Sequence, residues 1–282
     1  MTVHGASREA LAAAREQLDA LTDNTSVDAA KLADELAAVT ALLDREGSLR
    51  RHLTDPAQPG EAKAGLAQQL LGPQVGVGAS PPKVGEETLD LVSGLVRSRW
   101  SRSRDLTDAL EELSYSADLI DAQRANALDE VEDELFRFGR IVTGSSELRA
   151  ALSDKAASNQ AKAELLRSLL GGRANPVTER IVVRLVTHPR GRSLETGIDA
   201  LSKLAAARRN RMVAVVVSAV PLSDQQKERL GAALAKLYGR QVHLNLDVDP
   251  TVLGGITVRV GDEVINGTIA DRLDEAARRM AG

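Results

Sequence analysis

The glycine-rich stretch GGITVRVGDEVINGTIADRL, Gly254 to Leu273, is the first candidate for chemistry, because closely spaced glycines can turn backbone N–H groups toward a phosphate. It holds four of the chain's 22 glycines. Their spacing matches neither a P-loop nor a dinucleotide-binding GxGxxG turn. Gly76 and Gly78 fail the same test, because Pro81 occupies the third glycine position. The glycines therefore indicate tight turns, and no nucleotide cofactor is expected.

Catalytic and metal-binding side chains are the next candidates. The four histidines are scattered and form no HxxxH pair, and the chain has no cysteine and no GxSxG motif. The sequence therefore predicts no catalytic residue, no metal site and no cofactor. The histidines are His4, His52, His188 and His243.

The segment RSRWSRSR, Arg97 to Arg104, holds four arginines and the chain's only tryptophan. Arginines beside an aromatic ring could grip phosphates and stack on bases, so a nucleic-acid-binding protein is one alternative. The other interpretation is a solvated helix end or a contact with an acidic partner. The net charge of −4 favours this second interpretation, so no nucleic-acid partner is expected.

The amino-acid composition indicates which kind of secondary structure positions the residues named above. Apolar residues make up 43% of the 282 positions but aromatic residues only 2%, which is typical of closely packed helices rather than aromatic-lined pockets. The longest apolar run, Met212 to Val220, is too short to span a membrane. No secretory leader and no membrane insertion are expected, and the cytoplasm is the default compartment.

An internal repeat organises the first two thirds of the chain. Ser48 to Gly72 and Glu147 to Gly171 match at 12 of 25 positions, at an offset of 99 residues. Downstream, Thr88 and Thr178 pair at an offset of 90, so the extra residues form a Gly/Pro loop in the first copy. Each copy is predicted to be a bundle of five or six short helices.

Residues typical of helix ends predict where some of these helices begin and end. Asp55 before Pro56 predicts a helix start, and Asp154 marks the equivalent start in the second copy. Gly72 and Gly171 are predicted to end the helices that carry Leu66, Leu70 and Leu71 and their counterparts Leu165, Leu169 and Leu170.

The pattern changes after Arg211. The run Met212 to Val220 predicts a strand covered on both faces, and Ser223 with Gln226 forms a capping box for a helix to about Tyr238. Strict alternation in VHLNLDV predicts a second strand, and Ile256 to Val260 a third. Gly261-Asp262 is predicted to turn into a return strand, with a last helix over about 268–280.

The predicted fold is mainly α with a small α+β C-terminal domain. Three domains are expected: an extra helical bundle over 1–110, a second bundle over 111–210, and a small α+β domain over 211–282 with a short mixed sheet and two helices. Since no catalytic constellation is present, this architecture favours a protein that holds other proteins.

Residues 112 to 282 resemble the delta subunit of bacterial F-type ATP synthase, a relative of the mitochondrial oligomycin-sensitivity-conferring protein. The resemblance rests on spaced blocks in the family's order, with Asn266 and Thr268 at positions where the family has Asp and Ser. The blocks are LDEVEDELFRF, ELRAALSD, VSAVPLSDQQKERL, YGRQVHLNLDVDPTVLGGITVRVGD and VINGTIADRL.

The resemblance implies a non-catalytic stator subunit that joins the crown of the catalytic head to the b-subunit stalk, so that the head resists rotor torque. It implies that 112 to about 210 bind the N-terminal helices of alpha subunits, that about 212 to 282 bind the C-terminal stalk helices of b, and that beta is contacted indirectly. One copy per complex is expected, at the cytoplasmic face of the membrane. A helical adaptor unrelated to ATP synthase is the other alternative.

The partner-binding residues that follow from the resemblance lie in both regions. For the alpha-binding groove they are Tyr115, Leu119, Ile120, Val182, Leu185 and Val186, although helical spacing also fits a core role. For the stalk-binding domain they are His243, Arg259, Asp262 and Arg272. The extra bundle, 1 to about 105, is expected to add a second grip on the b stalk or the head.

Overall fold

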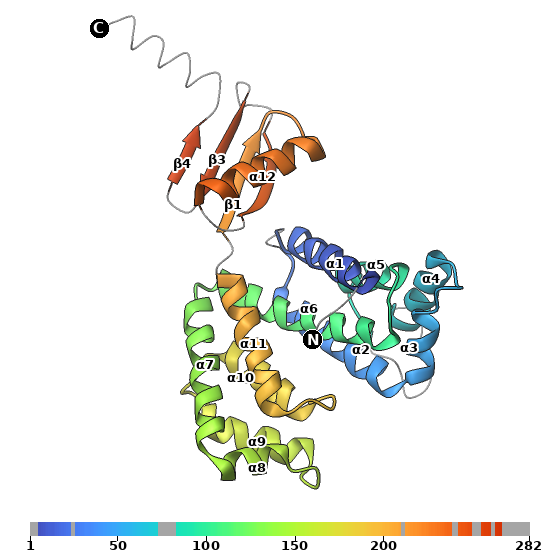
Figure 1. Cartoon of the computed structure of the whole chain (residues 1–282), viewed down its shortest axis with the longest axis vertical. Coiled ribbons are helices and arrows are strands. Elements are labelled where there is room, and N and C mark those ends of the chain that lie inside the picture. The colour runs from blue at the N-terminus through green and yellow to red at the C-terminus, as the bar shows by residue number, and fades with distance from the viewer. Residues whose placement is uncertain are drawn as a thin grey trace, which may run out of the picture. The chain divides into compact units, whose positions relative to one another are not determined.

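The computed structural model describes residues 5–23, 26–72, 83–209, 212–238, 242–249, 255–260 and 263–266. Over these residues a run of helices precedes a small mixed sheet, which confirms the predicted fold class (Figure 1). The chain divides into two compact units, Met1–Ala205 and Ala206–Gly282. The predicted Gly/Pro loop, the Gly261-Asp262 turn and the last helix lie outside the described residues.

The first unit is helical throughout its described part. Its helices are α1 (Ala6–Asp23), α2 (Ala29–Arg45), α3 (Gly47–Leu53), α4 (Gly60–Leu71), α5 (Glu86–Arg97), α6 (Ser103–Arg124), α7 (Leu128–Gly144), α8 (Ser146–Ser153), α9 (Asn159–Leu170), α10 (Pro176–Thr187) and α11 (Leu194–Arg209), which ends just past the unit boundary.

The sequence repeat is also a repeat of helices. The starts of α2, α3 and α4 recur 99 residues later as those of α7, α8 and α9, and α5 recurs 90 residues later as α10. Helix α6 serves both copies, because Leu106 and Leu110 lie in the first core while Tyr115 and Leu119 lie in the second. It is therefore the last helix of one bundle and the first helix of the next.

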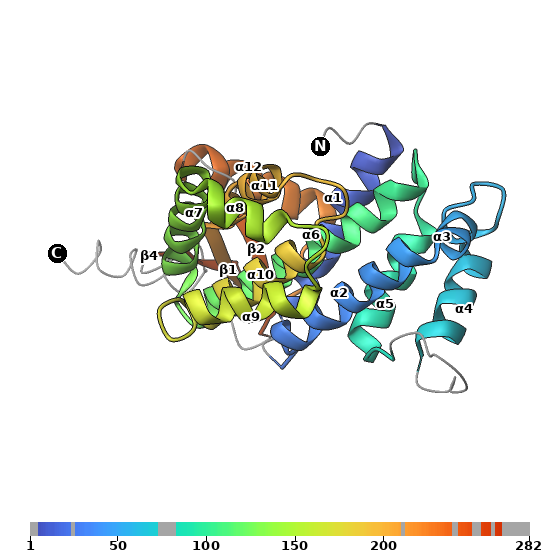
Figure 2. The same ribbon diagram turned by 90° about the horizontal axis from the view of Figure 1, so that it is seen from below.

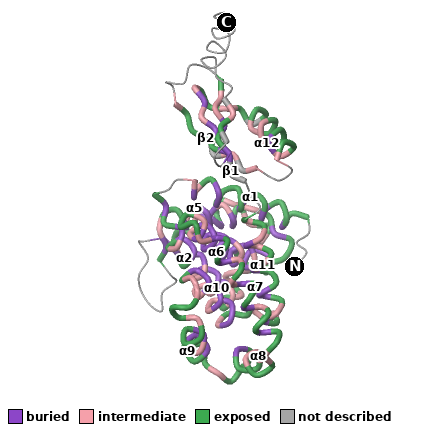
Figure 3. The backbone as a smooth tube through the Cα atoms, turned by 90° about the vertical axis from the view of Figure 1, so that its left-hand side faces the viewer, coloured by how far each residue is buried: buried purple, intermediate pink, exposed green. Residues whose placement is uncertain are grey.

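The two cores explain the position of α6. Buried residues concentrate along α6 and α10, while α8 and α9 expose most of their residues (Figure 3). Figure 2 shows the same helices from below. The predicted boundary near residue 110 falls inside α6, because one continuous helix supplies both cores and no linker intervenes. The division of the helical unit into two domains stays a prediction.

Two predicted helix starts are wrong, in the same way in both copies. The carboxylate of Asp55 accepts from the backbone N–H of Ala57, and Asp154 accepts from that of Ala156, so each aspartate stabilises a turn. The helices begin five residues after each aspartate, α4 at Gly60 and α9 at Asn159. Their predicted ends, with Gly72 and Gly171 at the C-cap, are confirmed.

A glutamate caps the fifth helix of each bundle from across the bundle. Glu35 Oε2 accepts from the backbone N–H of Gly85 at 3.0 Å and from Thr88 Oγ1 at 2.5 Å. In the second copy, Glu134 accepts from the backbone N–H of Asn175 at 3.0 Å and from Thr178 Oγ1 at 2.5 Å. Each carboxylate thus satisfies a free donor at a helix N-terminus, where negative charge is favoured.

The second unit contains a four-stranded sheet in its described part, with strand order β2-β1-β3-β4. The strands are β1 (Met212–Ser218), β2 (Val242–Val248), β3 (Ile256–Val260) and β4 (Glu263–Asn266). Helix α12 (Asp224–Tyr238) connects β1 to the parallel strand β2, whereas β3 is antiparallel to both β1 and β4. These elements confirm the predicted strands, and both Ser223–Gln226 hydrogen bonds of the capping box form.

The central strand β1 buries one face more fully than the other. Ala214 and Val216 lie in the core with Leu234 of α12, while Val215 on the opposite face is 38% exposed. The continuous apolar run predicted cover on both faces, and this prediction is wrong at Val215. Alternation along the strand explains the difference, because successive side chains point to opposite faces.

Candidate functional site

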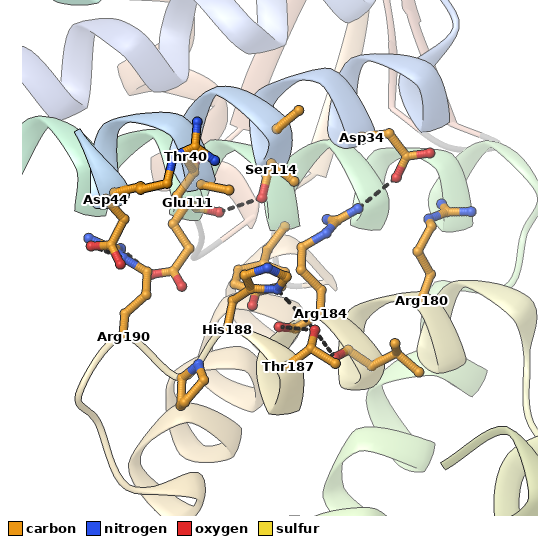
Figure 4. A pocket seen from close by; sticks show the side chains of 17 residues that line it. Asp34, Thr40, Asp44, Glu111, Ser114, Arg180, Arg184, Thr187, His188 and Arg190 are labelled. Carbon is orange, nitrogen blue, oxygen red and sulfur yellow. Dashed lines mark hydrogen bonds and ion pairs between the residues drawn. The ribbon is translucent and has the colours of Figure 1, made fainter. Parts of the chain in front are cut away.

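A groove of about 760 Å³ opens on the helical unit between α2 and α10 (Figure 4). Its α2 wall presents Ala37, Ala38 and Ala41, and its α10 wall presents Val183 and Thr187. Helix α6 contacts both α2 and α10 and contributes Ser114 and Tyr115. Small side chains at helical spacing on α2 leave an apolar trough between two helices.

Two ion pairs connect the walls of the groove. Asp34 of α2 pairs with Arg184 of α10 at 2.8 Å, and Asp44 of α2 pairs with Arg190, beyond the end of α10, at 3.3 Å. Figure 4 shows the Asp34–Arg184 pair bridging the two helices. These pairs fix the spacing between a helix of the first bundle and a helix of the second.

Asp118 of α6 anchors the α10 wall. Its fully buried carboxylate accepts from Arg180 Nε at 2.6 Å and from Arg184 Nη1 at 2.5 Å. Burial raises the pKa of Asp118 above its ordinary value, although the two guanidiniums oppose this shift. For Arg180, burial lowers the pKa, but attraction to Asp118 and Asp121 outweighs it and the net shift is upward. Breaking such a buried pair from one side is costly.

Arg190 is the second residue that anchors the groove by buried ion pairs. Its side chain is only 4% exposed and pairs with Asp108 and Glu111 of α6, both at 2.8 Å, as well as with Asp44. Burial lowers the pKa of Arg190, but these carboxylates together raise it above the ordinary value. The backbone of Arg190 is left-handed, with φ of 51°, which costs a non-glycine residue about 1 kcal/mol. The buried ion pairs offset this strain.

Tyr115 forms part of the groove from α6. Burial raises the pKa of its phenol far above the ordinary value, with Glu111 contributing in the same direction. The Arg184 guanidinium lies 5.9 Å from the ring centroid, within the range of a cation–π contact. Tyr115 therefore connects α6 to the Arg184 ion pairs of the α10 wall.

The predicted alpha-binding residues cluster on α6 and α10, but all six are buried. Of these only Tyr115 lines the groove; the others lie in the cores and support its walls. A direct contact of these residues with a partner stays a prediction. The core residues are Leu119, Ile120, Val182, Leu185 and Val186.

Sequence reasoning missed the α2 wall. Ala37, Ala38 and Ala41 look like ordinary helix formers in the sequence, and nothing there shows that α2 packs on a helix shared with the second bundle. The internal repeat gave one hint. The equivalent positions on α7 carry Phe136, Arg137 and Arg140, so the small residues on α2 are not shared by both copies.

The predicted stalk-binding residues are only partly covered by the structure. Arg259 lies on β3 with an exposed side chain, and His243 lies on β2 at the register position opposite Val213. Asp262 and Arg272 lie outside the described residues. The sheet places Arg259 between Val215 of β1 and Val264 of β4, both partly exposed.

The arginine-rich segment RSRWSRSR connects α5 to α6 and does not form a stacking platform. Trp100 is buried, and its indole N–H donates to the carbonyl of Leu95 at 2.8 Å. Arg97 pairs with Glu61, and Arg102 pairs with Asp105. The nucleic-acid alternative needs a free aromatic ring, so the structure argues against it.

Among the described residues, no group of histidine and acidic side chains could hold a metal ion. Over the same part of the chain, no helix has the length and apolar character needed to cross a membrane.

Comparisons with known proteins identify the family. The family described as ATP synthase delta (OSCP) subunit matches residues 113–280. ATP synthase subunit delta of Streptomyces griseus is 75% identical over 99% of this chain and 100% of that protein. The same subunit of Thermobifida fusca is 46% identical over 99% of this chain and 100% of that protein.

One solved structure is similar over part of the chain. A chain in the Toxoplasma gondii mitochondrial ATP synthase hexamer is 27% identical, with a TM-score of 0.28, over 61% of this chain and 97% of that chain.

This chain belongs to the ATP synthase delta (OSCP) subunit family. Its function is that of a non-catalytic stator subunit in the peripheral stalk of an F-type ATP synthase. It is therefore part of a membrane-associated complex. The relatives span the whole chain, including the first bundle, whereas the family match begins at residue 113, within α6.

Proposed function

We propose that this chain joins the catalytic head to the stalk through two separate contacts. The second bundle binds N-terminal helices of alpha subunits, and the α+β unit binds the C-terminal stalk helices of b. Beta is contacted only indirectly, one copy serves each complex, and the joint lies at the cytoplasmic face of the membrane.

The observation that carries the head contact is the groove between α2 and α10. It is long, largely apolar in its walls, and built from side chains at helical spacing, which is the surface that an amphipathic helix recognises. The ion pairs that hold its walls stabilise a preformed shape, so a bound helix does not have to order it.

The stalk contact is supported by the sheet unit. Val215 and Val264 leave apolar surface on one face of the sheet, on either side of the exposed Arg259, and adjoining exposed apolar residues favour a protein partner. The first bundle has its own core and is proposed to add a second grip on the head or on the b stalk.

The role of the chain is mechanical. The head experiences torque from the rotor, and a joint that binds head and stalk together keeps the head from turning. Several moderate contacts on one chain reinforce each other, because each contact raises the local concentration for the next.

Copurification from membranes tests the proposal. Tagged full-length protein should recover alpha, beta and b subunits together, and variants in the groove and in the sheet should separate the two contacts. Val183→Glu, which places a charge in the groove, should release alpha and beta but retain b, while Val264→Glu should release b first. Recovery of neither set would reject the joint, and recovery only with nucleic acid would support the alternative function.

A further inference from the structure

Helix α2 lies outside the region shared with the whole family, yet it forms half of the groove. The family match begins at residue 113, within α6, so α10 and most of α6 belong to the matched region while α2 precedes it. The extra bundle therefore changes the surface of the second bundle at the place where a helix-shaped trough is found.

The internal repeat shows that the α2 wall differs from its own counterpart. The positions equivalent to Ala37, Ala38 and Ala41 carry Phe136, Arg137 and Arg140 on α7. Phe136 is 57% exposed, and both arginines are exposed as well. The two copies therefore differ at this position: α7 exposes large and charged side chains, whereas α2 carries small, half-buried ones that line the groove. Their smallness opens the groove.

The charges in the groove narrow the choice of occupant. Each of its four arginines is already paired with a carboxylate of this chain, through Glu46, Asp118, Asp34 or Glu111. The groove thus offers no unbalanced positive charge to a small anion. What remains for recognition is the apolar stripe of Ala37, Ala38 and Ala41, which covers about 6 Å along α2 at 1.5 Å per residue, at the centre of a lining that runs about 15 Å from Asp34 to Asp44. The whole lining is about as long as three turns of a helix, with apolar contact at its centre and charged residues at both ends.

We propose that α2 of the extra bundle is one wall of the head-binding groove, and that its alanines receive the apolar face of an amphipathic helix from the catalytic head. This inference rests on the proposed function, since it assumes that the chain binds the head through a helix-in-groove contact. It assigns the extra bundle a direct part in that contact. Selection of the partner helix then depends on Ala37, Ala38 and Ala41 as well as on α6 and α10.

Because the chain has no cysteine, single cysteines report on individual positions without background. Ala38→Cys places a thiol in the groove, and Arg137→Cys places one at the equivalent position of α7. Each full-length variant is labelled with a maleimide, alone and with saturating purified head or a synthetic peptide of the first ~25 residues of alpha. We expect head and peptide to slow labelling of Ala38→Cys at least tenfold and to leave Arg137→Cys unchanged.

A second measurement uses side chains that the repeat itself tolerates. Ala38→Arg with Ala41→Arg copies the α7 residues onto α2 and should weaken peptide binding at least tenfold, while Arg137→Ala with Arg140→Ala should bind like the unmodified chain. Thermal unfolding checks that both variants remain folded.

The outcomes separate the inference from the proposed function. If the unmodified chain binds head and peptide but Ala38→Cys is labelled equally fast in the complex, or the double arginine variant binds equally well, the α2 wall is not part of the site and the inference is overturned while head binding stands. If the unmodified chain binds neither head nor peptide, the proposed head contact and the inference both fail.

Discussion

The two glutamates that cap α5 and α10 allow one physical argument to be tested twice in one chain. Glu35 and Glu134 occupy equivalent positions and accept the same pair of hydrogen bonds, one from a backbone N–H and one from a threonine hydroxyl. Replacing either glutamate with alanine leaves both donors without their acceptor at a helix N-terminus. Because the repeat duplicates the geometry, both substitutions should have similar effects.

The size of the effect follows from the bonds that are lost. A hydrogen bond to a charged group contributes about 1.5–3 kcal/mol, and the loss of a helix N-cap costs about 0.5–2 kcal/mol. Glu35 retains 16% of its side-chain exposure, so water partly compensates the freed donors. We expect about 2–3 kcal/mol for each alanine variant and about half of that for glutamine, which keeps one acceptor oxygen. In a unit of this size, 2–3 kcal/mol lowers Tm by roughly 4–12 °C.

Thermal and urea unfolding of the full chain measure this prediction. Glu16→Ala on α1 is the control, because this exposed glutamate should change stability by less than about 0.5 kcal/mol. The two caps share no residue, so the double variant should lose the sum of the single effects within about 0.5 kcal/mol. A Tm within 1–2 °C of the unmodified chain for both alanine variants would refute the capping argument.

Three further predictions concern buried groups. Asp118→Ala should destabilise the helical unit by about 3 kcal/mol, at the lower end for a broken buried ion pair because Arg180 is 27% exposed. Urea unfolding measures this loss of stability, with Asp118→Asn as the milder control. A loss below about 1 kcal/mol would contradict the prediction. The raised pKa of Tyr115 predicts a delayed phenol ionisation at 295 nm, and since the unfolded phenol titrates near pH 10, the stability from this group is complete below about pH 10 and lost as pH rises further. The chain has two tyrosines. Ionisation of both phenols near pH 10 in the folded chain would contradict the prediction, and so would a high-pH ionisation step that remains in Tyr115→Phe. Buried Trp100 should fluoresce at short wavelength and remain unquenched by single-stranded DNA or RNA at low salt; strong quenching would revive the nucleic-acid alternative.

Much of the fold could be predicted, because the repeat and the alternating strands leave regular signals in the sequence. The offsets that pair Thr88 with Thr178 locate α5 and α10, and the alternation in VHLNLDV locates β2. The helix starts at Asp55 and Asp154 could not be separated from turns, since an aspartate side chain accepts equally well from a turn N–H and from a helix N–H.

The groove was harder to predict, because it depends on packing between segments far apart in the chain. The resemblance named Val182 and Leu185, and helical spacing could not distinguish the buried side of α10 from the side facing the groove. The role of α6 in both cores is equally hidden, since charged residues such as Glu111 and Asp118 interrupt its apolar pattern and nothing in the sequence shows that they are buried. The structural role of Arg190 could not be predicted, because it depends on ion pairs with carboxylates of α2 and α6 that lie far away in the sequence.

The central claim is that this chain couples the head to the stalk without taking part in chemistry. The most direct measurement is ATP-driven proton pumping by membrane vesicles from cells lacking the subunit, reconstituted with purified head and with this protein. The account predicts that the protein restores both head binding and proton pumping, while the ATPase rate of the isolated head stays unchanged. Full pumping without the protein, or head binding that never restores pumping, would contradict it.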